Sequence, residues 1–247
     1  MLRKLIHGFY LIYVILFFLA TLFLVLPFYF IFSRLKPSIA QKRIRQLTRL
    51  WCKVWLRCCG LQVQKMNAIP AQGPYVIIAN HVSYLDPIII FDVLDYAFKP
   101  LGKYEISKAP LFGFIYAQIA IMVDRSKLQS RARSMEMMKQ LLNENCSVFL
   151  YPEGTFNESE SPMKSFYDGA FRLAIEAQVP IVALLFPDTK KRWHYSGWYR
   201  LNPGKNRVYA LKPFYTQGLS LKELPDLKAT IHQQMSSKMQ ELQQNTQ

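Results

Sequence analysis

The sequence predicts an α/β domain, with a mostly parallel sheet flanked by helices, that follows a long apolar N-terminal helix. Three observations favour this fold class. After Gly60, short apolar runs typical of buried strands alternate with helical patterns. Before it, an uncharged stretch runs from Gly8 to Ser33. Hydrophobic residues make up 51% of the 247 residues, which suffices for a sizeable core and excludes a disordered chain.

The apolar stretch 8–33 is longer than the roughly 20 residues that a bilayer core requires. A signal peptide would have a shorter apolar core ending at small residues, whereas Phe, Tyr and Leu fill the end of this run. We therefore expect a membrane-embedded segment. Pro27 leaves two forms open, a helix that crosses the bilayer or a hairpin within one leaflet. Basic residues at both ends do not choose between them.

Residues 37–59 predict a basic amphipathic helix. An apolar stripe recurs at three- and four-residue intervals, at Ile44, Leu47, Trp51, Val54 and Cys58. Lys and Arg residues surround this stripe, which suits the headgroup layer of an anionic membrane. The alternative is a helix whose stripe packs on the globular domain. We take residues 1–59 as a membrane anchor and residues 60–247 as the second domain.

The basic excess belongs to the N-terminal part of the chain. Lys and Arg total 31 against 16 Asp and Glu, a net charge of +15, yet no acid precedes Asp86. Cations concentrated around an apolar segment favour an anionic membrane surface as partner, and not nucleic acid, because no nucleic-acid motif accompanies them. The four cysteines match neither a disulfide framework nor a zinc pattern, which favours reduced thiols on the cytoplasmic face.

Beyond Gly60 we expect strands and helices in alternation. The expected strands are residues 75–79, 119–123, 147–151, 181–186 and 208–211, and the expected helices are residues 87–95, 110–117, 128–144, 169–177 and 224–242. In open parallel sheets, ligands bind beyond the carboxyl ends of the strands. The polar segments that follow the strands are therefore the candidate site.

The first such segment is NHVSYLDP, directly after the strand YVIIA. His81 and Asp86 would not share a face of a regular helix, but they can meet in a turn that enters one. Pro87 suits the first helical position and Asp86 the cap before it. A histidine oriented by a carboxylate is a general base suited to deprotonating a hydroxyl. The alternative is that Asp86 only caps and His81 is an ordinary loop residue.

Two further segments also follow strands. Lys103 and Arg125 could bind a phosphate at one sheet edge or be ordinary solvated cations. In YPEGT, Glu153, Gly154 and Thr155 offer a carboxylate, backbone N–H groups and a hydroxyl. These groups could orient a polyol phosphate or form only a tight turn.

Together these segments resemble the glycerolipid acyltransferase family, most closely its bacterial 1-acylglycerol-3-phosphate acyltransferases. His81 and Asp86 match the His-x4-Asp signature. Lys103 and the VDR run at 123–125 match the basic strand-end segment, YPEGT matches the third signature, and residues 179–182 match the fourth. Four signatures in register are far more specific than any one of them.

The resemblance implies the glycerolipid acyltransferase fold and an enzyme that acylates the free hydroxyl of 1-acylglycerol-3-phosphate, making phosphatidic acid in phospholipid biosynthesis. The acyl donor would be acyl-CoA or an acyl carrier protein, with no metal and no cofactor. The implied catalytic residues are His81 and Asp86, and the implied substrate-binding residues are Lys103, Arg125, Glu153, Gly154 and Thr155.

Three positions depart from the family pattern. Ala183 replaces a proline common in the fourth signature, and Ile119 stands where a glycine often precedes the VDR-like run. The third departure bears on the substrate. Family members often carry an Arg after Glu-Gly-Thr that helps to hold the substrate phosphate, whereas this chain has Phe156. Lys103, Arg125 or Arg172 could compensate, or the acceptor could be a lyso-amino-lipid or another lysophospholipid. The alternative from a different class is a non-catalytic protein that binds the membrane surface.

Overall fold

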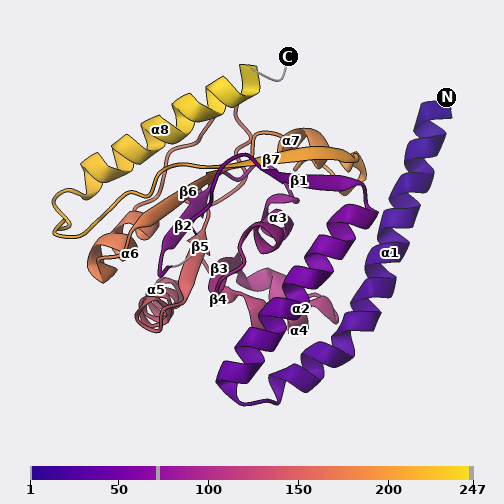
Figure 1. Cartoon of the computed structure of the whole chain (residues 1–247), viewed down its shortest axis with the longest axis horizontal. Coiled ribbons are helices and arrows are strands. Elements are labelled where there is room, and N and C mark those ends of the chain that lie inside the picture. Colours follow the sequence, from indigo (N-terminus) through magenta and orange to yellow (C-terminus); the bar gives the residue numbers. More distant parts are fainter. Residues whose placement is uncertain (1, 71–72, 245–247) are drawn as a thin grey trace.

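The computed structural model describes residues 2–70 and 73–244. Its strands within these ranges are β1 (Leu61–Lys65), β2 (Val76–Ala79), β3 (Phe98–Lys103), β4 (Ile121–Val123), β5 (Ser147–Leu150), β6 (Ile181–Leu185) and β7 (Gly204–Ala210). They form one sheet in the order β1-β7-β6-β2-β5-β3-β4, shown in Figure 1. All neighbouring pairs are parallel except β6 and β7. The predicted mostly parallel α/β fold is confirmed.

Helices cover both faces of this sheet (Figure 1). They are α1 (Leu2–Ser33), α2 (Pro37–Cys58), α3 (Asp86–Val93), α4 (Phe112–Ile119), α5 (Leu128–Asn143), α6 (Gly169–Ala177), α7 (Thr189–Arg192) and α8 (Leu224–Gln244), with 3₁₀ turns η1 (Tyr104–Lys108) and η2 (Trp198–Arg200). Strand β2 shows the layering. Its Val76 and Ile78 join the core under α5, α6 and α8, while Ile77 and Ala79 join the core under α2 and α3.

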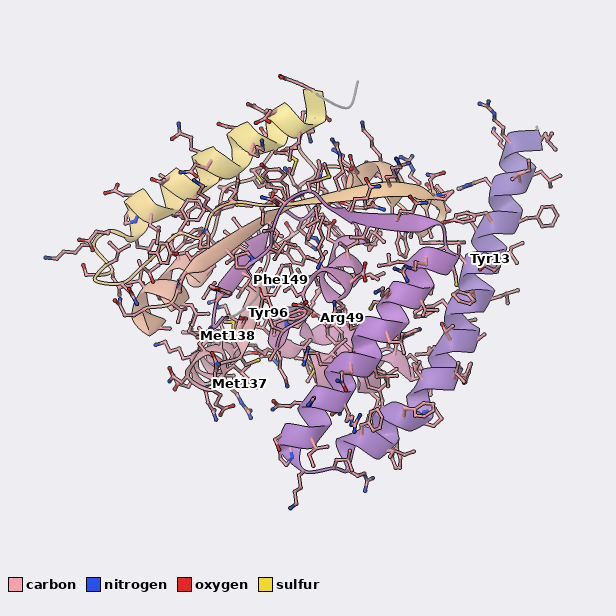
Figure 2. All side chains as sticks on the ribbon, viewed as in Figure 1. Tyr13, Arg49, Tyr96, Met137, Met138 and Phe149 are labelled. Carbon is pink, nitrogen blue, oxygen red and sulfur yellow. The ribbon has the colours of Figure 1, made fainter. Side chains whose placement is uncertain are left out.

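Helix α1 runs unbroken through Pro27, so the alternative of a hairpin within the apolar run is wrong. The chain reverses after Ser33, and α2 returns beside α1 (Figure 1). Three hydrogen bonds join this antiparallel pair. The Tyr10 hydroxyl donates to the Cys59 carbonyl at 2.9 Å, and the Tyr13 hydroxyl (Figure 2) donates to the Cys58 carbonyl at 3.2 Å. The Tyr29 and Thr48 hydroxyls lie 2.6 Å apart. By length and composition, α1 is a candidate membrane span.

The buried face of α2 differs from the predicted stripe. Trp51 and Trp55 are buried, whereas Val54 is 41% exposed and Cys58 is exposed. This face packs on α1, α3 and β1, so the alternative of a helix docked on the domain describes α2. Because its tryptophans lie inside the protein, they cannot insert into a headgroup layer.

Most predicted elements occur within two or three residues of their expected bounds, and two strands were not predicted. Strand β1 has the alternation of apolar and polar residues that is typical of strands but is only five residues long, while β3 contains Pro100 and Gly102, which disfavour strands. Strand β4 begins at Ile121, later than predicted, because α4 extends to Ile119. Pairing of β1 with β7 and of β3 with β5 stabilises these two strands, which their local sequences alone did not predict.

Candidate active site

His81 lies in the turn between β2, the central strand of the sheet, and α3. The preceding Asn80 is buried and anchors this turn to the end of β6, because its side chain exchanges two hydrogen bonds with the backbone of Phe186, at 2.8 and 3.3 Å. The turn thereby starts from a fixed point at the carboxyl end of the sheet.

Asp86 orients the His81 ring. Its Oδ2 lies 3.0 Å from His81 Nδ1 and also accepts hydrogen bonds from the backbone N–H groups of Val82 and Ser83, at 2.8 and 2.9 Å. With Nδ1 donating to the carboxylate, the neutral ring leaves Nε2 as a proton acceptor. The structure thus brings together the pair that the sequence predicts.

Asp86 is not the cap that the sequence suggests. Helix α3 begins at Asp86 itself, with Leu85 at the N-cap position and, in this described segment, no side-chain capping bond. The Asp86 carboxylate instead bonds backward to the turn that carries His81. Asp86 is fully buried, so its negative charge faces the turn and not the solvent.

Aromatic rings enclose the His81 imidazole. The Tyr151 ring stacks on it with centroids 3.8 Å apart and planes 11° apart, and the Phe156 ring lies 4.2 Å away at 46°. The His81 side chain keeps 16% of its surface exposed, so a substrate can reach it. Rings on both sides restrict the imidazole to one plane.

The segment after β5 also holds the His81 backbone. The His81 N–H donates to Glu153 Oε1 at 2.9 Å, and the His81 carbonyl accepts from the Asn157 N–H at 2.7 Å. The second Glu153 oxygen accepts from the Lys164 N–H at 2.9 Å. Glu153 is buried, and burial raises the pKa of its carboxyl to about 7 although the hydrogen bonds from Lys164 and His81 lower it.

Gly154 and Thr155 complete this segment. Gly154 has a φ of +75°, and a Cβ there would lie 2.7 Å from the Tyr167 ring. Its N–H donates to the Tyr151 carbonyl at 3.0 Å and is engaged inside the protein. Thr155 is exposed, and its hydroxyl accepts from Lys164 Nζ at 3.0 Å. Lys164 is a cation near the site that the sequence analysis missed.

Lys103 and Arg125 lie at the same edge of the sheet but not against His81. Lys103 ends β3 and Arg125 follows β4, two and three strands from β2. At about 4.8 Å per strand, these positions are roughly 10 and 14 Å along the edge. Both side chains are exposed, with Lys103 Nζ 4.0 Å from Glu105. Arg172, on α6, lies 3.8 Å from Glu176 on the same helix.

A further segment missed by the sequence analysis follows β6. The Ser83 hydroxyl donates to the Trp193 carbonyl at 2.6 Å, and Ser83 and His194 form an isolated β-bridge. The Tyr195 ring stacks near Phe156, with centroids 6.1 Å apart. The available signal was the composition WHYSGWYR at 193–200, which is unusually aromatic for a loop and follows the basic run KKR at 190–192.

Comparisons with known proteins agree on the family. A family model described as acyltransferase matches residues 60–186. The 1-acyl-sn-glycerol-3-phosphate acyltransferase alpha of Homo sapiens is 30% identical over 212 residues, which cover 83% of this chain and 72% of that protein. The 1-acyl-sn-glycerol-3-phosphate acyltransferase of Haemophilus influenzae is 28% identical, covering 68% of this chain and 69% of its own.

The fold has a counterpart among solved structures. The crystal structure of the 1-acyl-sn-glycerophosphate (LPA) acyltransferase PlsC from Thermotoga maritima superposes with a TM-score of 0.76, covering 98% of this chain and 96% of that one. The two sequences are 18% identical. This likeness therefore concerns the fold, which includes the N-terminal helices as well as the sheet.

Proposed function

This chain belongs to the acyltransferase family, and from that premise we propose that it transfers a fatty acyl group from an acyl thioester to the free hydroxyl of 1-acylglycerol-3-phosphate, making phosphatidic acid. The observation that carries the proposal is the His81–Asp86 pair, joined at 3.0 Å at the carboxyl end of the central strand. The non-catalytic alternative is dropped, because the relatives are enzymes and a binding protein needs no oriented base.

In the proposed mechanism, His81 Nε2 takes the proton of the acceptor hydroxyl as its oxygen attacks the thioester carbonyl carbon. The C–S bond then breaks, and the leaving thiolate takes the proton from the imidazolium. Asp86 stabilises the imidazolium through Nδ1. Each step balances without a covalent acyl-enzyme or a metal.

Lys103 and Arg125 would bind the acceptor phosphate. Their exposure at the sheet edge supports this role, because a ligand can replace the water around them. Glu153 and Gly154, which the resemblance implies as glycerol contacts, are proposed to act through His81, since their polar groups already bond within the protein. Thr155 and Lys164 form the exposed edge of that segment and would meet the acceptor.

One observation favours a different lyso-lipid as a second candidate acceptor. Phe156 packs on the rings of His81 and Tyr84, with centroids 4.2 and 5.1 Å away. This position therefore lends no cation to a phosphate, and a lyso-amino-lipid or a lysophospholipid with a larger headgroup remains the alternative acceptor.

The proposed location is a membrane, with the acyltransferase domain on its cytoplasmic face. The apolar helix α1 supports the membrane, and the four free cysteines support a reducing compartment. Exposed basic residues of α2, such as Lys42 and Arg43, would face anionic headgroups. The proposed donor is acyl-CoA or an acyl carrier protein.

A panel of acceptors tests the proposed function. Purified full-length protein is assayed with one acyl-CoA and with lysophosphatidate, lysophosphatidylethanolamine, lysophosphatidylglycerol and a lyso-amino-lipid, and thiol release is measured. We expect kcat/KM to be highest with lysophosphatidate. A higher value with another lyso-lipid would transfer the proposal to that acceptor, and no release with any of them would overturn it.

A further inference from the structure

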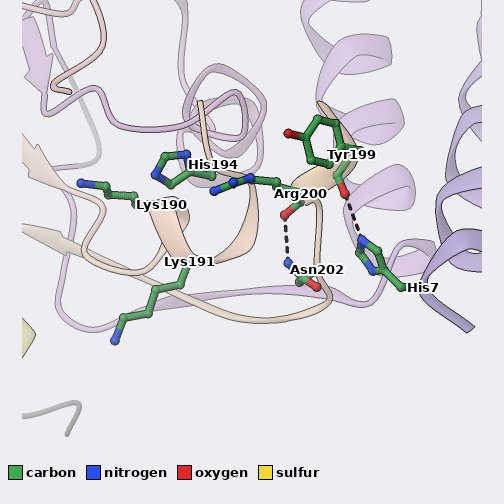
Figure 3. Close-up of a pocket in the computed structure, with 7 residues that line it drawn as sticks. All are labelled: His7, Lys190, Lys191, His194, Tyr199, Arg200 and Asn202. Carbon is green, nitrogen blue, oxygen red and sulfur yellow. Dashed lines mark hydrogen bonds between the residues drawn. The ribbon is translucent and has the colours of Figure 1, made fainter. Parts of the chain in front are cut away.

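A basic hollow of about 420 Å³ lies beside the candidate active site. Figure 3 shows its lining, which includes His7, Lys190, Lys191, His194, Tyr199 and Arg200. None of the described residues that line it is acidic, and three of them carry a permanent positive charge. A concave surface whose permanently charged groups are all cations attracts an anion.

Hydrogen bonds fix the walls of this hollow. The Asn202 N–H donates to the Arg192 carbonyl at 2.7 Å, and Trp193 pairs with Leu201 as a β-bridge, which closes the loop 193–201 on itself. His7 Nε2 bonds to the Tyr199 carbonyl at 2.9 Å (Figure 3). The first turns of α1 thereby form one wall, and the loop after α7 forms the other.

The charges inside the hollow are not neutralised by the nearest buried acid. Asp188, at the start of α7, is bonded by Arg207 through both carboxylate oxygens, at 2.7 and 2.9 Å. Burial lowers the pKa of His194, and the nearby cations Arg200 and Lys190 lower it further. The field inside the hollow is therefore positive enough to oppose another positive charge.

A layer of two successive aromatic side chains, Phe156 and Tyr195, separates the hollow from His81. His81 lies 4.2 Å from Phe156, Phe156 lies 6.1 Å from Tyr195, and Tyr195 lies under Lys190 Nζ at 5.8 Å. A ligand anchored in the hollow can therefore extend a flexible arm across this layer to the base.

The sheet order places the hollow opposite Lys103 and Arg125. The hollow is built after β6, on one side of β2, whereas Lys103 and Arg125 follow β3 and β4 on the other side. His81, after β2, lies between two groups of cations. Two anionic substrates that approached from opposite sides would meet at His81.

We propose that this hollow binds the nucleotide end of an acyl-CoA donor, while the acceptor phosphate binds on the side of Lys103 and Arg125. The inference rests on the proposed function. CoA joins its thiol, through a flexible arm, to an adenosine diphosphate with a 3′-phosphate. The hollow has the volume of a small-molecule site. The half-exposed Tyr199 ring offers a surface on which adenine can stack.

An acyl carrier protein fits this feature less well. A stable protein interface buries about 800 Å² on each partner, a far wider area than one concave hollow provides. The cations Lys190, Lys191 and Arg200 gather within this one small concave area. The shape therefore favours a nucleotide.

The test measures binding of adenosine 3′,5′-bisphosphate to full-length protein in detergent by calorimetry, with no acceptor present. We expect Lys190→Gln and Arg200→Gln each to weaken binding about tenfold, because each removes a charge-assisted contact with phosphate. Lys212→Gln is the matched control, since Lys212 is exposed and follows β7 near the start of β6, away from the hollow. Its affinity should equal that of the wild type.

Kinetics separate this inference from the proposed function. In both variants, KM for acyl-CoA should rise about tenfold while KM for lysophosphatidate stays unchanged. Turnover of an acyl-N-acetylcysteamine thioester, which lacks the nucleotide, should equal that of the wild type. Bisphosphate binding that the variants weaken would support the hollow even if no lyso-lipid were acylated.

Three results would overturn the inference. Equal binding of the bisphosphate by wild type and variants would show that the hollow does not hold the nucleotide. A loss seen with acyl carrier protein but not with acyl-CoA would make it a protein-docking surface. An equal loss with the short thioester would show that the substitutions act on the chemistry and not on the donor.

Discussion

The turn that carries His81 and the edge that carries Lys103 and Arg125 belong to one sheet but are built in opposite ways. The turn is largely buried, and the His81 ring, N–H and carbonyl each have a partner within the protein. The edge is exposed, and Lys103 lies 4.0 Å from Glu105, at the outer limit of an ion pair. A proton-transfer group needs a fixed geometry before substrate arrives, whereas cations that bind phosphate keep their donors available.

Removing the Asp86 carboxylate, which bonds to the His81 ring, should have the largest effect on activity. We expect Asp86→Asn to lower kcat by roughly 100- to 10,000-fold, because the amide would no longer hold a protonated ring. The same change places an NH₂ group near the N–H donors of Val82 and Ser83 and destabilises the turn by about 1–3 kcal/mol. Steady-state kinetics and chemical denaturation measure the two effects. A variant with wild-type kcat would place Asp86 outside the chemistry.

Substitution of Glu153 tests whether catalysis requires the hydrogen bonds that fix the backbone of the turn. We expect Glu153→Gln to lower kcat about 10- to 100-fold with KM nearly constant, because one of the N–H groups of His81 and Lys164 loses its acceptor and His81 shifts. Glu160→Gln, an exposed acid in the same loop, is the matched control and should retain full activity. Equal activity of the two variants would mean that the hydrogen bonds that Glu153 accepts are dispensable for catalysis.

The Glu153 carboxyl should also make the stability of the protein depend on pH. The folded pKa of Glu153 is raised to about 7 from an ordinary value of 4.5 by burial, so between these values the folded protein binds a proton that the unfolded chain releases. This contribution to stability is therefore full below pH 4.5 and decreases as the pH rises to 7, by on the order of 3 kcal/mol. Denaturation of wild type and Glu153→Gln at pH 5 and pH 8 measures it. The variant should show the smaller decrease, and identical pH slopes would contradict the raised pKa.

Substitutions at the exposed edge should weaken substrate binding and leave the stability of the fold unchanged. We expect Lys103→Ala and Arg125→Ala each to raise KM for lysophosphatidate about tenfold, with kcat and the melting temperature little changed. KM for monoacylglycerol, which lacks the phosphate, should not change. If kcat fell while both KM values held, the edge would belong to the chemistry, and the contrast between the two regions would be wrong.

Gly154→Ala should give the smallest effect, and we expect that effect in the free energy of unfolding. Its φ of +75° costs an L-residue roughly 1–2 kcal/mol, and the added Cβ would push on the exposed Tyr167 ring, which can move. Gly218→Ala is the matched control, because Gly218 has a φ of +80° with open space around its Cβ position. The difference between the two free energies of unfolding isolates the contact with Tyr167, and we expect it to stay below about 1 kcal/mol.

The sequence predicted the parts of the molecule that depend on local pattern. The strand before His81, the turn to Asp86 and the helix after it follow one another within residues 76–93, so each carries its signal in the local sequence. The resemblance to a known family then favoured His81 and Asp86 as a catalytic pair over the alternative of a loop histidine and a helix cap. Helix α2 shows the limit of periodicity, since its pattern indicated Val54 and Cys58 for the buried face, where the structure has Thr48 and Trp55.

What could not be predicted depends on contacts between distant segments. The stacking of Tyr151 and Phe156 on His81 and the bond of Glu153 to the His81 backbone join segments that follow different strands. The hollow requires His7 to meet Tyr199, which lies 192 residues away. Such placements follow from the order of strands in the sheet, which no local pattern encodes.

Thiol release by His81→Ala in the presence of lysophosphatidate and acyl-CoA tests the central claim most directly. The Tyr151 and Phe156 rings would remain around the vacated position, so added imidazole can enter it. We predict less than about 1% of wild-type turnover for the variant, with partial recovery in imidazole and unchanged membrane association. Turnover close to that of the wild type, without imidazole, would contradict the role of His81 as the base.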